Sequence, residues 1–575
     1  MFGNLGHLIP TGLVPQAPPK EVPPPTPVNF PRCFPQHRTD DLEGDGSGRP
    51  PKHLASVLQG IIRPTEVTVA HLAALGSYVI NDSTITELIP DPAYIPDFTA
   101  WEALSADEAH SVNESTRKKI NTGALSPGCQ AYLERKRELS ISNTLAYRAI
   151  RRVTPPKGQT QARLGNSFEF FRFLELLSTF WDDSTQDAVP EENPQEAKND
   201  KPEGDSEEAK PALAPREIRF YRTGAGHQMP PDYRQNIVTA FLKLVAYDFG
   251  CNASAPRTEP RLYVSSPASS PRVRSSYFSS GCTFIFRTPT TREAARAGIV
   301  EGPLAAISAR HTVTFPAPRP DSTPAADRDS TLDLARELIA ALITAQHRAR
   351  EGREEKRIGE SAWWATKPRW GGGSGGPIGR EIDNQSGADD AVGDKDVPPL
   401  EEAQSSAPAS DAVPPPTSRP SSKNIDDLRR SKYLSLRGSG GEKGAKRQKK
   451  SGNLPMYDNY RMVRPPSAAW DKKTKYMAVG RKKGVDYDDV FVVSTLFHHM
   501  SVLRVRVPDS LLKALDGEEV EPWGKLEVRR SKWFDFFKAE DRVEAMQLVW
   551  SMMNWMMRAE EEDQKADEDV EMGDT

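Results

Sequence analysis

Two blocks of apolar residues, separated by a long stretch of different composition, constrain the fold most strongly. In residues 216–350, apolar positions recur at helical spacing after Pro230 and Pro231, β-branched and aromatic runs follow, and a second helical pattern closes the block. Residues 487–558 have the same order, with a helical pattern that begins at Asp541. Because a sheet of two or three strands needs a covering layer, we expect the two blocks to share one core.

The patterns also predict where the individual elements lie. Asp232 is expected to cap the first helix of the core, and Asp329 or Thr331 to open the second. Between and after these helices we expect strands at 261–264, 282–287, 304–309, 311–315, 490–496, 502–507 and 525–529.

The chain before the first block is expected to be mostly helical. Short helices are predicted for 53–62 and 67–75, a strand within 78–89, and a mainly helical pattern for 116–151. Residues 164–181 form the most apolar helical pattern of this region. Their many aromatic side chains are more typical of a core helix than of a binding surface.

Much of the remaining chain has too few apolar residues to fold. Hydrophobic residues make up 37% of the chain, which contains 50 prolines and 39 glycines, so large segments cannot offset their ordering entropy. We predict an α+β fold with one split core of short antiparallel strands covered by helices, and long disordered Pro/Ser/Ala-rich arms and insertions. The expected segments are a proline-rich arm (1–51), a mostly helical region packing on the core (52–181), an acidic linker (182–213), the N-terminal section of the α+β core (214–382), a disordered insertion with a basic cluster (383–453), the C-terminal section of the α+β core (454–558) and an acidic tail (559–575).

Cysteine spacing and charge narrow the class of protein. The four cysteines are scattered without CxxC spacing, which indicates reduced thiols in an intracellular protein. No secretory signal pattern and no apolar run of membrane-spanning length is present, so no membrane association is expected. The formal net charge of −4 is close to neutral for this length. Affinity for nucleic acid would therefore have to come from local patches.

One such patch is a basic cluster in the predicted insertion. Its cations lie among glycine and serine, and their grouping predicts a bipartite nuclear-import signal. The alternative is a solvated basic segment that contacts nucleic acid weakly. The cluster therefore predicts a nuclear location, with the cytoplasm as the alternative. The residues are Arg429, Arg430, Lys432, Lys446, Arg447, Lys449 and Lys450.

A second patch interleaves tryptophan with basic residues. Such a segment can stack bases and neutralise phosphates; alternatively, the tryptophans anchor the segment to the core. We favour the anchor, because the glycines at 371–376 lack the spacing of a phosphate-binding loop. The residues are Trp363, Trp364, Lys367, Arg369 and Trp370.

Catalytic motifs are not evident in the sequence. His498 and His499 are adjacent in a predicted strand, so their side chains are expected on opposite faces and unsuited to joint metal ligation. A convergence of His227, Glu301, His311 and Asp321 in the core would carry no recognisable chemistry. A restriction-nuclease-like core would need paired Asp and Glu-x-Lys residues, which are missing. We therefore predict no catalytic, cofactor-binding or metal-binding residues.

The predicted function is that of a non-catalytic adaptor or structural subunit in a nuclear complex associated with chromatin or RNA. Its partners would be other proteins, with nucleic acid a weaker partner and no cofactor. The alternative is a nucleic-acid-processing enzyme or nucleic-acid-binding protein whose site is not recognisable. The sequence leaves the oligomeric state open.

Overall fold

The computed structural model describes residues 24–32, 53–185, 222–309, 315, 328–351, 367–368 and 475–559, with gaps at 62, 156–157, 255–259, 270–274 and 288–298. Its α-helices are α1 (Leu54–Leu58), α2 (Val69–Ala74), α3 (Ile85–Leu88), α4 (Phe98–Glu102), α5 (Ala106–Val112), α6 (Cys129–Leu139), α7 (Asn143–Ile150), α8 (Phe168–Leu177), α9 (Pro231–Ala246), α11 (Arg328–Arg348), α15 (Asp509–Leu515) and α16 (Ala539–Met556). Its strands are β1 (Ser77–Ile80), β2 (Cys251–Ser254), β3 (Arg261–Ser265), β4 (Ser275–Ser279), β5 (Thr283–Arg287), β6 (Ile299–Ala309), β7 (Lys367–Pro368), β8 (Lys475–Met477), β9 (Tyr487–Leu496), β10 (His499–Pro508), β11 (Leu526–Arg530) and β12 (Phe534–Asp535).

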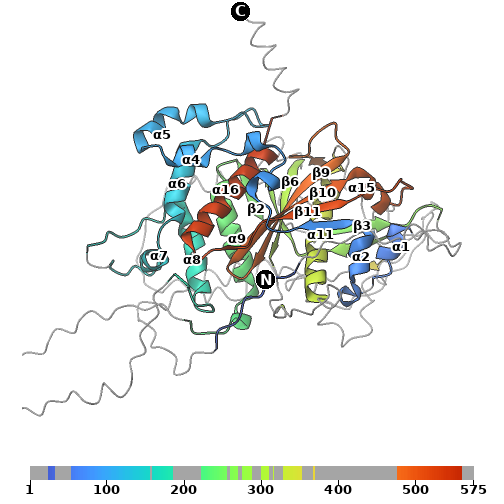
Figure 1. Cartoon of the computed structure of the whole chain (residues 1–575), viewed down its shortest axis with the longest axis horizontal. Coiled ribbons are helices and arrows are strands. Elements are labelled where there is room, and N and C mark those ends of the chain that lie inside the picture. Colours follow the sequence, from blue (N-terminus) through green and yellow to red (C-terminus); the bar gives the residue numbers. More distant parts are fainter. Residues whose placement is uncertain are drawn as a thin grey trace, which may run out of the picture. The chain divides into compact units, whose positions relative to one another are not determined.

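A nine-stranded sheet organises the described residues (Figure 1). Its strand order is β1-β11-β10-β9-β6-β5-β2, with β12 paired to β10 and β8 paired to β6. A smaller sheet has the order β3-β4-β7. The large sheet therefore contains strands from both apolar blocks, together with β1 from the chain before them and β8 from the chain between them.

The α+β class is confirmed, but the expectation of short antiparallel strands holds only in part. The sheet is mixed: β1 pairs in parallel with β11, and β6 pairs in parallel with both β8 and β9. β6 has 11 residues, and β9 and β10 have 10 each. A parallel pair requires a long crossover connection, and α11 lies within the connection from β6 to β9. That pairing joins distant segments, so local patterns could not indicate its direction.

Both faces of the central strands are buried, which explains their continuous apolar runs. In β9, Phe491 and Val493 belong to one hydrophobic cluster, whereas Val490 and Val492 belong to the other. The strand alternation distributes consecutive residues to opposite faces. The sheet is therefore the middle layer between two groups of helices.

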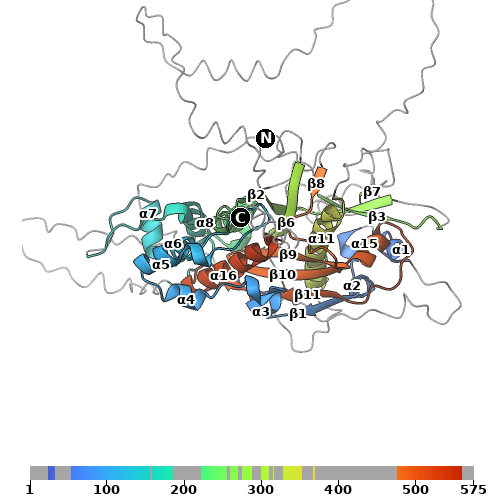
Figure 2. The same ribbon diagram turned by 90° about the horizontal axis from the view of Figure 1, so that it is seen from above.

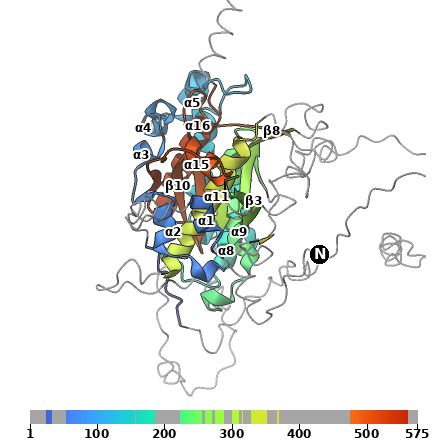
Figure 3. The ribbon, with the colours of Figure 1, turned by 90° about the vertical axis from the view of Figure 1, so that its right-hand side faces the viewer.

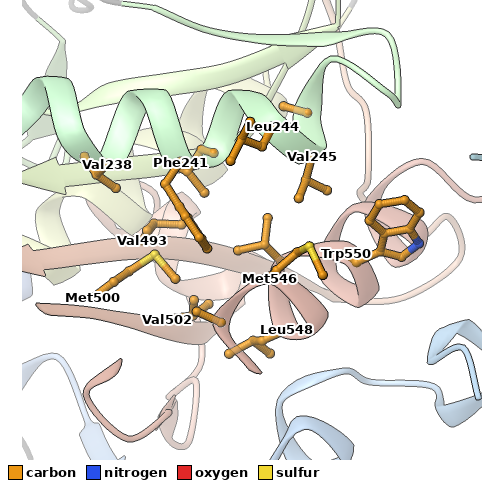
Figure 4. Packing of buried hydrophobic residues seen from close by; sticks show 14 of the residues in the cluster. Val238, Phe241, Leu244, Val245, Val493, Met500, Val502, Met546, Leu548 and Trp550 are labelled. Carbon is orange, nitrogen blue, oxygen red and sulfur yellow. The ribbon is translucent and has the colours of Figure 1, made fainter. Parts of the chain in front are cut away.

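The first face is covered by α9, α16 and the helices α6 to α8. Figure 4 shows Val238 and Phe241 of α9 close to Val493 and Met500 of the strands, with Met546 of α16 beside them. The apolar stripe predicted for α9 is the stripe that packs here. This face holds the larger of the two hydrophobic clusters.

The second face is covered by α11, with α1, α2 and α15 beside it (Figures 2 and 3). All residues of α11 from Ser330 to Arg348 are buried. Its charged residues are paired within the core: Arg348 Nη1 lies 2.8 Å from Asp488 Oδ1, and Glu337 forms an ion pair with Arg530. These pairs tie α11 to β9 and β11.

The predicted positions of most described elements are confirmed to within a few residues. Several elements were not predicted: the helices α4, α5 and α15 and the strands β2, β4, β7, β8 and β12. In the region 78–89, where a strand was predicted, β1 ends at Ile80 and α3 follows. Asp232, the predicted cap of α9, lies inside the helix, whose N-cap is Pro230. The predicted strand 311–315 lies outside the described residues except for Phe315. The predicted insertion 383–453 lies wholly outside them, as does the tail after residue 559.

Candidate functional site

The turn between β9 and β10 carries the candidate site. Leu496 at the end of β9 pairs with His499 at the start of β10, so Phe497 and His498 form a two-residue loop. Phe497 has a φ of 53°, in the left-handed region that side chains other than glycine rarely adopt. Its ring packs against Trp181 with 4.3 Å between ring centroids. Packing therefore holds a turn that the backbone alone disfavours.

The expectation that His498 and His499 point to opposite sides is wrong. That expectation placed both residues in a strand, where side chains alternate. His498 lies in the loop instead, and the centroids of the two imidazole rings are 4.2 Å apart. The two rings can therefore act on one bound group.

Asp535 completes the cluster from β12, where it lies opposite His499. Asp535 Oδ1 is 3.8 Å from His498 Nε2, and Asp535 Oδ2 is 3.9 Å from His499 Nε2. The backbone N–H of Phe537 donates to Asp535 Oδ1 at 2.9 Å, which orients the carboxylate. One ligand-type atom from each of the three side chains lies within 4.8 Å of the others. Two imidazoles and one carboxylate are a donor set suited to a transition-metal ion.

Burial sets the charge of the cluster. It lowers the pKa of His499 to about 4, and it lowers the pKa of His498 well below its usual value, with His499 as a second cause. Burial also raises the pKa of Asp535 to about 6, against the effect of the Phe537 hydrogen bond. At pH 7 both imidazoles are therefore neutral and the carboxylate is ionised. These are the protonation states that ligate metals.

Aromatic rings close the cluster on two sides. On the inner side, the ring of Phe537 lies 4.5 Å and that of Trp181 lies 5.8 Å from the ring of His498. On the outer side, Phe30 meets His499 edge to face at 5.0 Å and stacks on Trp533 at 5.2 Å. Phe30 is 38% exposed. Solvent therefore lies nearest to the cluster on the side of Phe30.

Phe30 belongs to a segment, residues 24–32, that has no helix or strand and docks on the core. Three hydrogen bonds anchor this segment: Gly226 N donates to Thr26 Oγ1 at 2.8 Å, Asn29 Nδ2 donates to the Phe315 carbonyl at 3.0 Å, and Arg32 N donates to Ser330 Oγ at 2.8 Å. We call residues 24–32 the docked segment. It is the portion of the predicted proline-rich arm that the structure describes.

Glycine is required where the docked segment meets the core. A Cβ atom on Gly226 would lie 2.4 Å from Cζ2 of Trp181 and 3.1 Å from Cβ of Thr26. Because Gly226 has no side chain, Thr26 of the docked segment and the ring of Trp181 can both approach its backbone.

A buried polar network adjoins Phe537. Asn143 Nδ2 donates to the Phe537 carbonyl and to Asp183 Oδ2, both at 2.8 Å, and Arg542 Nη1 donates to Asn143 Oδ1 at 2.6 Å. Burial lowers the pKa of Arg542 to about 10. This network links α7 and α16 with Asp183, which follows α8 in the chain. The Nε atom of Arg542 has no hydrogen-bond partner among the described residues.

The histidine cluster contains none of the sequence-predicted site residues. The structure describes only the backbone of Lys367, which pairs in parallel with Ser276 of β4. The other residues of the tryptophan segment (Trp363, Trp364, Arg369 and Trp370) and the import cluster (Arg429, Arg430, Lys432, Lys446, Arg447, Lys449 and Lys450) lie outside the described residues.

The histidine cluster was missed because no sequence spacing links Asp535 to the two histidines. The proximity of the two histidine rings could have been predicted only by recognising that Phe497 and His498 form a two-residue loop. Of the four polar residues considered for convergence, Glu301 is bound by Arg287, and His311 and Asp321 lie outside the described residues.

A second candidate is an open cleft lined in part by Asn113, Gln130, Glu134 and Asp248. Asp248 already holds the guanidinium of Arg135 at 3.0 Å. The cleft therefore has fewer groups available for a ligand than the histidine cluster.

No family model, no curated protein and no solved structure matches this chain. Within the ranges that the structure describes, none of the helices has the length and apolar character needed to cross a membrane.

Proposed function

We propose that the protein is a non-catalytic adaptor or structural subunit of a nuclear protein complex. The observation that carries the proposal is the docked segment, an extended, proline-containing stretch that the core binds through Phe30 and three hydrogen bonds. An aromatic contact combined with backbone and side-chain hydrogen bonds is a common mode of recognising extended peptides. A core that binds such a segment of its own chain has a surface suited to segments of the same kind.

The buried charges of the core also support a structural role. Glu301 is paired with Arg287, Asp488 with Arg348, and Asp489 Oδ1 lies 3.0 Å from Arg506 Nε. A metal-dependent nuclease needs carboxylates that are free to bind its ions. These carboxylates are instead held by guanidinium groups.

The nuclear localisation in this proposal rests on the basic cluster from Arg429 to Lys450, whose grouping resembles a bipartite import signal. Association with chromatin or RNA would follow from the complex in which the protein takes part, and it belongs to the same proposal.

A nucleic-acid-binding protein is the second candidate, favoured by the pairing of Lys367 with β4. This pairing places Lys367 beside β4, in the sheet that also contains Tyr263 and Tyr277. Tyr263 and Tyr277 are buried, however, and the guanidinium of Arg261 lies 4.0 Å from the ring centroid of Tyr277. These two tyrosine rings therefore offer no open face to a base, which makes this candidate the weaker one.

The adaptor proposal is tested by purifying the tagged full-length protein from nuclear extract and measuring the mass and composition of what elutes. We expect a stable complex with stoichiometric protein partners. A monomer that turns over nucleic acid would contradict the proposal.

The binding of the docked segment by the core is tested separately with a labelled peptide of residues 22–34. The peptide is expected to bind the Phe30→Ala protein more tightly than the wild type, because the variant's own segment has lost its aromatic anchor. Tyr247→Ala, which changes an exposed tyrosine on another surface, is the matched control and should behave as wild type. Equal binding to all three proteins would show that the docking surface does not select such segments.

A further inference from the structure

The inference concerns what His498, His499 and Asp535 bind, and it goes beyond the proposed adaptor function. The Nδ1 atoms of both histidines are buried and have no hydrogen-bond partner among the described residues. Their Nε2 atoms lie 3.8 and 3.9 Å from the Asp535 carboxylate, too far for a hydrogen bond. His498 is only 5% exposed. The ring of His498 is therefore buried and that of His499 half-buried, each with an unsatisfied Nδ1 atom.

Burial without hydrogen bonds is costly for an imidazole, because the ring gives up its contacts with water and gains none in return. A fold tolerates such groups where another partner satisfies them. Imidazole nitrogens and a carboxylate oxygen that lie within 4.8 Å of one another are donors that a divalent transition-metal cation takes. The cluster therefore has the donor set of a metal-binding site.

We propose that His498, His499 and Asp535 bind one divalent transition-metal ion of the Zn²⁺ type. In a tetrahedral zinc site the ligand bonds are about 2.0–2.2 Å, which places ligand atoms about 3.4 Å apart. The two nitrogen–oxygen distances, 3.8 and 3.9 Å, exceed this separation by about 0.5 Å. Small rotations of the three side chains bring the donors to bonding distance. Nitrogen donors favour zinc over Mg²⁺ and Ca²⁺, which take oxygen ligands.

The surroundings indicate a stabilising role for the ion. It would connect the β9–β10 turn to β12, two pieces of chain that are also joined here by the short pairing of β10 with β12 and by a hydrogen bond from the Phe536 N–H to the His498 carbonyl. The bound ion would also reinforce the turn in which Phe497 has a positive φ. Phe537 and Trp181 close the inner side and Phe30 covers the outer side. The three protein ligands leave a fourth position for water on the side nearest to solvent.

The test uses the full-length protein and Zn²⁺ itself. After removal of metal with a chelator, the protein is titrated with Zn²⁺, bound zinc is counted by mass spectrometry of the metal, and thermal unfolding is recorded with and without zinc. We expect one tightly bound ion per chain and a higher unfolding midpoint with zinc. Mg²⁺ and Ca²⁺ should not raise the midpoint. Co²⁺ should give visible absorption bands of a four-coordinate nitrogen and oxygen site.

Three variants locate the site. His498→Gln and His499→Gln are expected to abolish tight zinc uptake. Asp535→Asn retains an acceptor for the Phe537 N–H, and we expect it to weaken binding by about 100-fold or more, since loss of a mere supporting partner costs about 10–100-fold. His110→Gln, which removes an exposed histidine of α5, is the matched control and should bind as wild type.

The results of these measurements distinguish a metal site from its absence. If His498→Gln does not fold, His499→Gln and Asp535→Asn decide the question, because those side chains are less deeply buried. A wild-type chain that takes up no zinc would overturn the metal site. Zinc uptake that is unchanged in both of these variants would overturn it as well. Neither result bears on the adaptor function, which is judged by the partners recovered.

Discussion

The guanidinium of Arg348 and the carboxylate of Asp488 lie 2.8 Å apart with at most 1% of either side chain exposed. Arg348 ends α11 and Asp488 lies in β9, so this pair joins two segments that are distant in the sequence. Arg348 Nε also donates to the Pro303 carbonyl of β6 at 2.7 Å. Burial raises the pKa of Asp488, and the nearby arginines oppose that change. Burying a charge of this kind is strongly unfavourable unless its counter-charge is buried beside it.

Removing one member of this pair should be strongly destabilising. We expect Arg348→Met to lower the free energy of unfolding by about 3–5 kcal/mol, because Asp488 is left buried without a counter-charge. The double variant Arg348→Met with Asp488→Leu should recover a large share of the loss. Chemical denaturation of the two variants and the wild type checks this. Equal losses in the single and double variants would show that the charge pair is not the cause.

Stability should fall on mild acidification, partly because of His347 in α11. Burial, with Arg350 as a second cause, lowers the pKa of His347 well below 6.5. Below pH 6.5 the unfolded chain therefore binds a proton at this residue and the folded chain does not. The stabilisation is present above pH 6.5 and is lost as the pH falls.

Replacing His347 should remove its share of this pH dependence. Between pH 7.5 and 5.5 we expect the wild type to lose about 1.4 kcal/mol more than His347→Gln, with metal chelated throughout. The other histidines contribute equally to the pH dependence of both proteins, so their contributions cancel in the difference. His110→Gln, which changes an exposed side chain, should follow the wild type. Parallel curves for His347→Gln and wild type would contradict the prediction.

The import prediction is tested by replacing Lys446, Arg447, Lys449 and Lys450 with alanine. We expect the fluorescently tagged variant to leave the nucleus while its unfolding midpoint stays that of the wild type, because the change removes recognition by the import machinery and no core contact. Alanine replacement of Lys482 and Lys483 is a suitable control for the loss of positive charge. Nuclear accumulation of the cluster variant would contradict the prediction.

The two interpretations of the tryptophan segment give opposite results. If Trp363, Trp364 and Trp370 are core anchors, each change to alanine should cost about 3–5 kcal/mol where the ring is fully buried. If they form a stacking platform, the variants should unfold like the wild type and lose about 1–3 kcal/mol of single-strand binding per stacked base. We expect the stability loss. Salt-sensitive oligonucleotide binding by variants of unchanged stability would favour the nucleic-acid alternative.

The sequence by itself determined the type and approximate position of most described elements. The stripe from Ile237 to Val245 predicts α9, and the apolar run from Val490 predicts β9. Periodicity reports on such elements because it is a local property: a helix or strand with one or two buried faces needs apolar residues at fixed intervals.

Only the tertiary structure decided how these elements pair and what they bring together. The parallel pairing of β6 with β9 depends on contacts between distant segments. The local sequence pattern therefore predicts neither the relative direction nor the register of the two strands. The meeting of His498, His499 and Asp535 depends on a two-residue turn held by packing against Trp181 and on the pairing of β12 with β10. Side chains converge through backbone geometry and long-range packing, and residue spacing along the chain does not report on either.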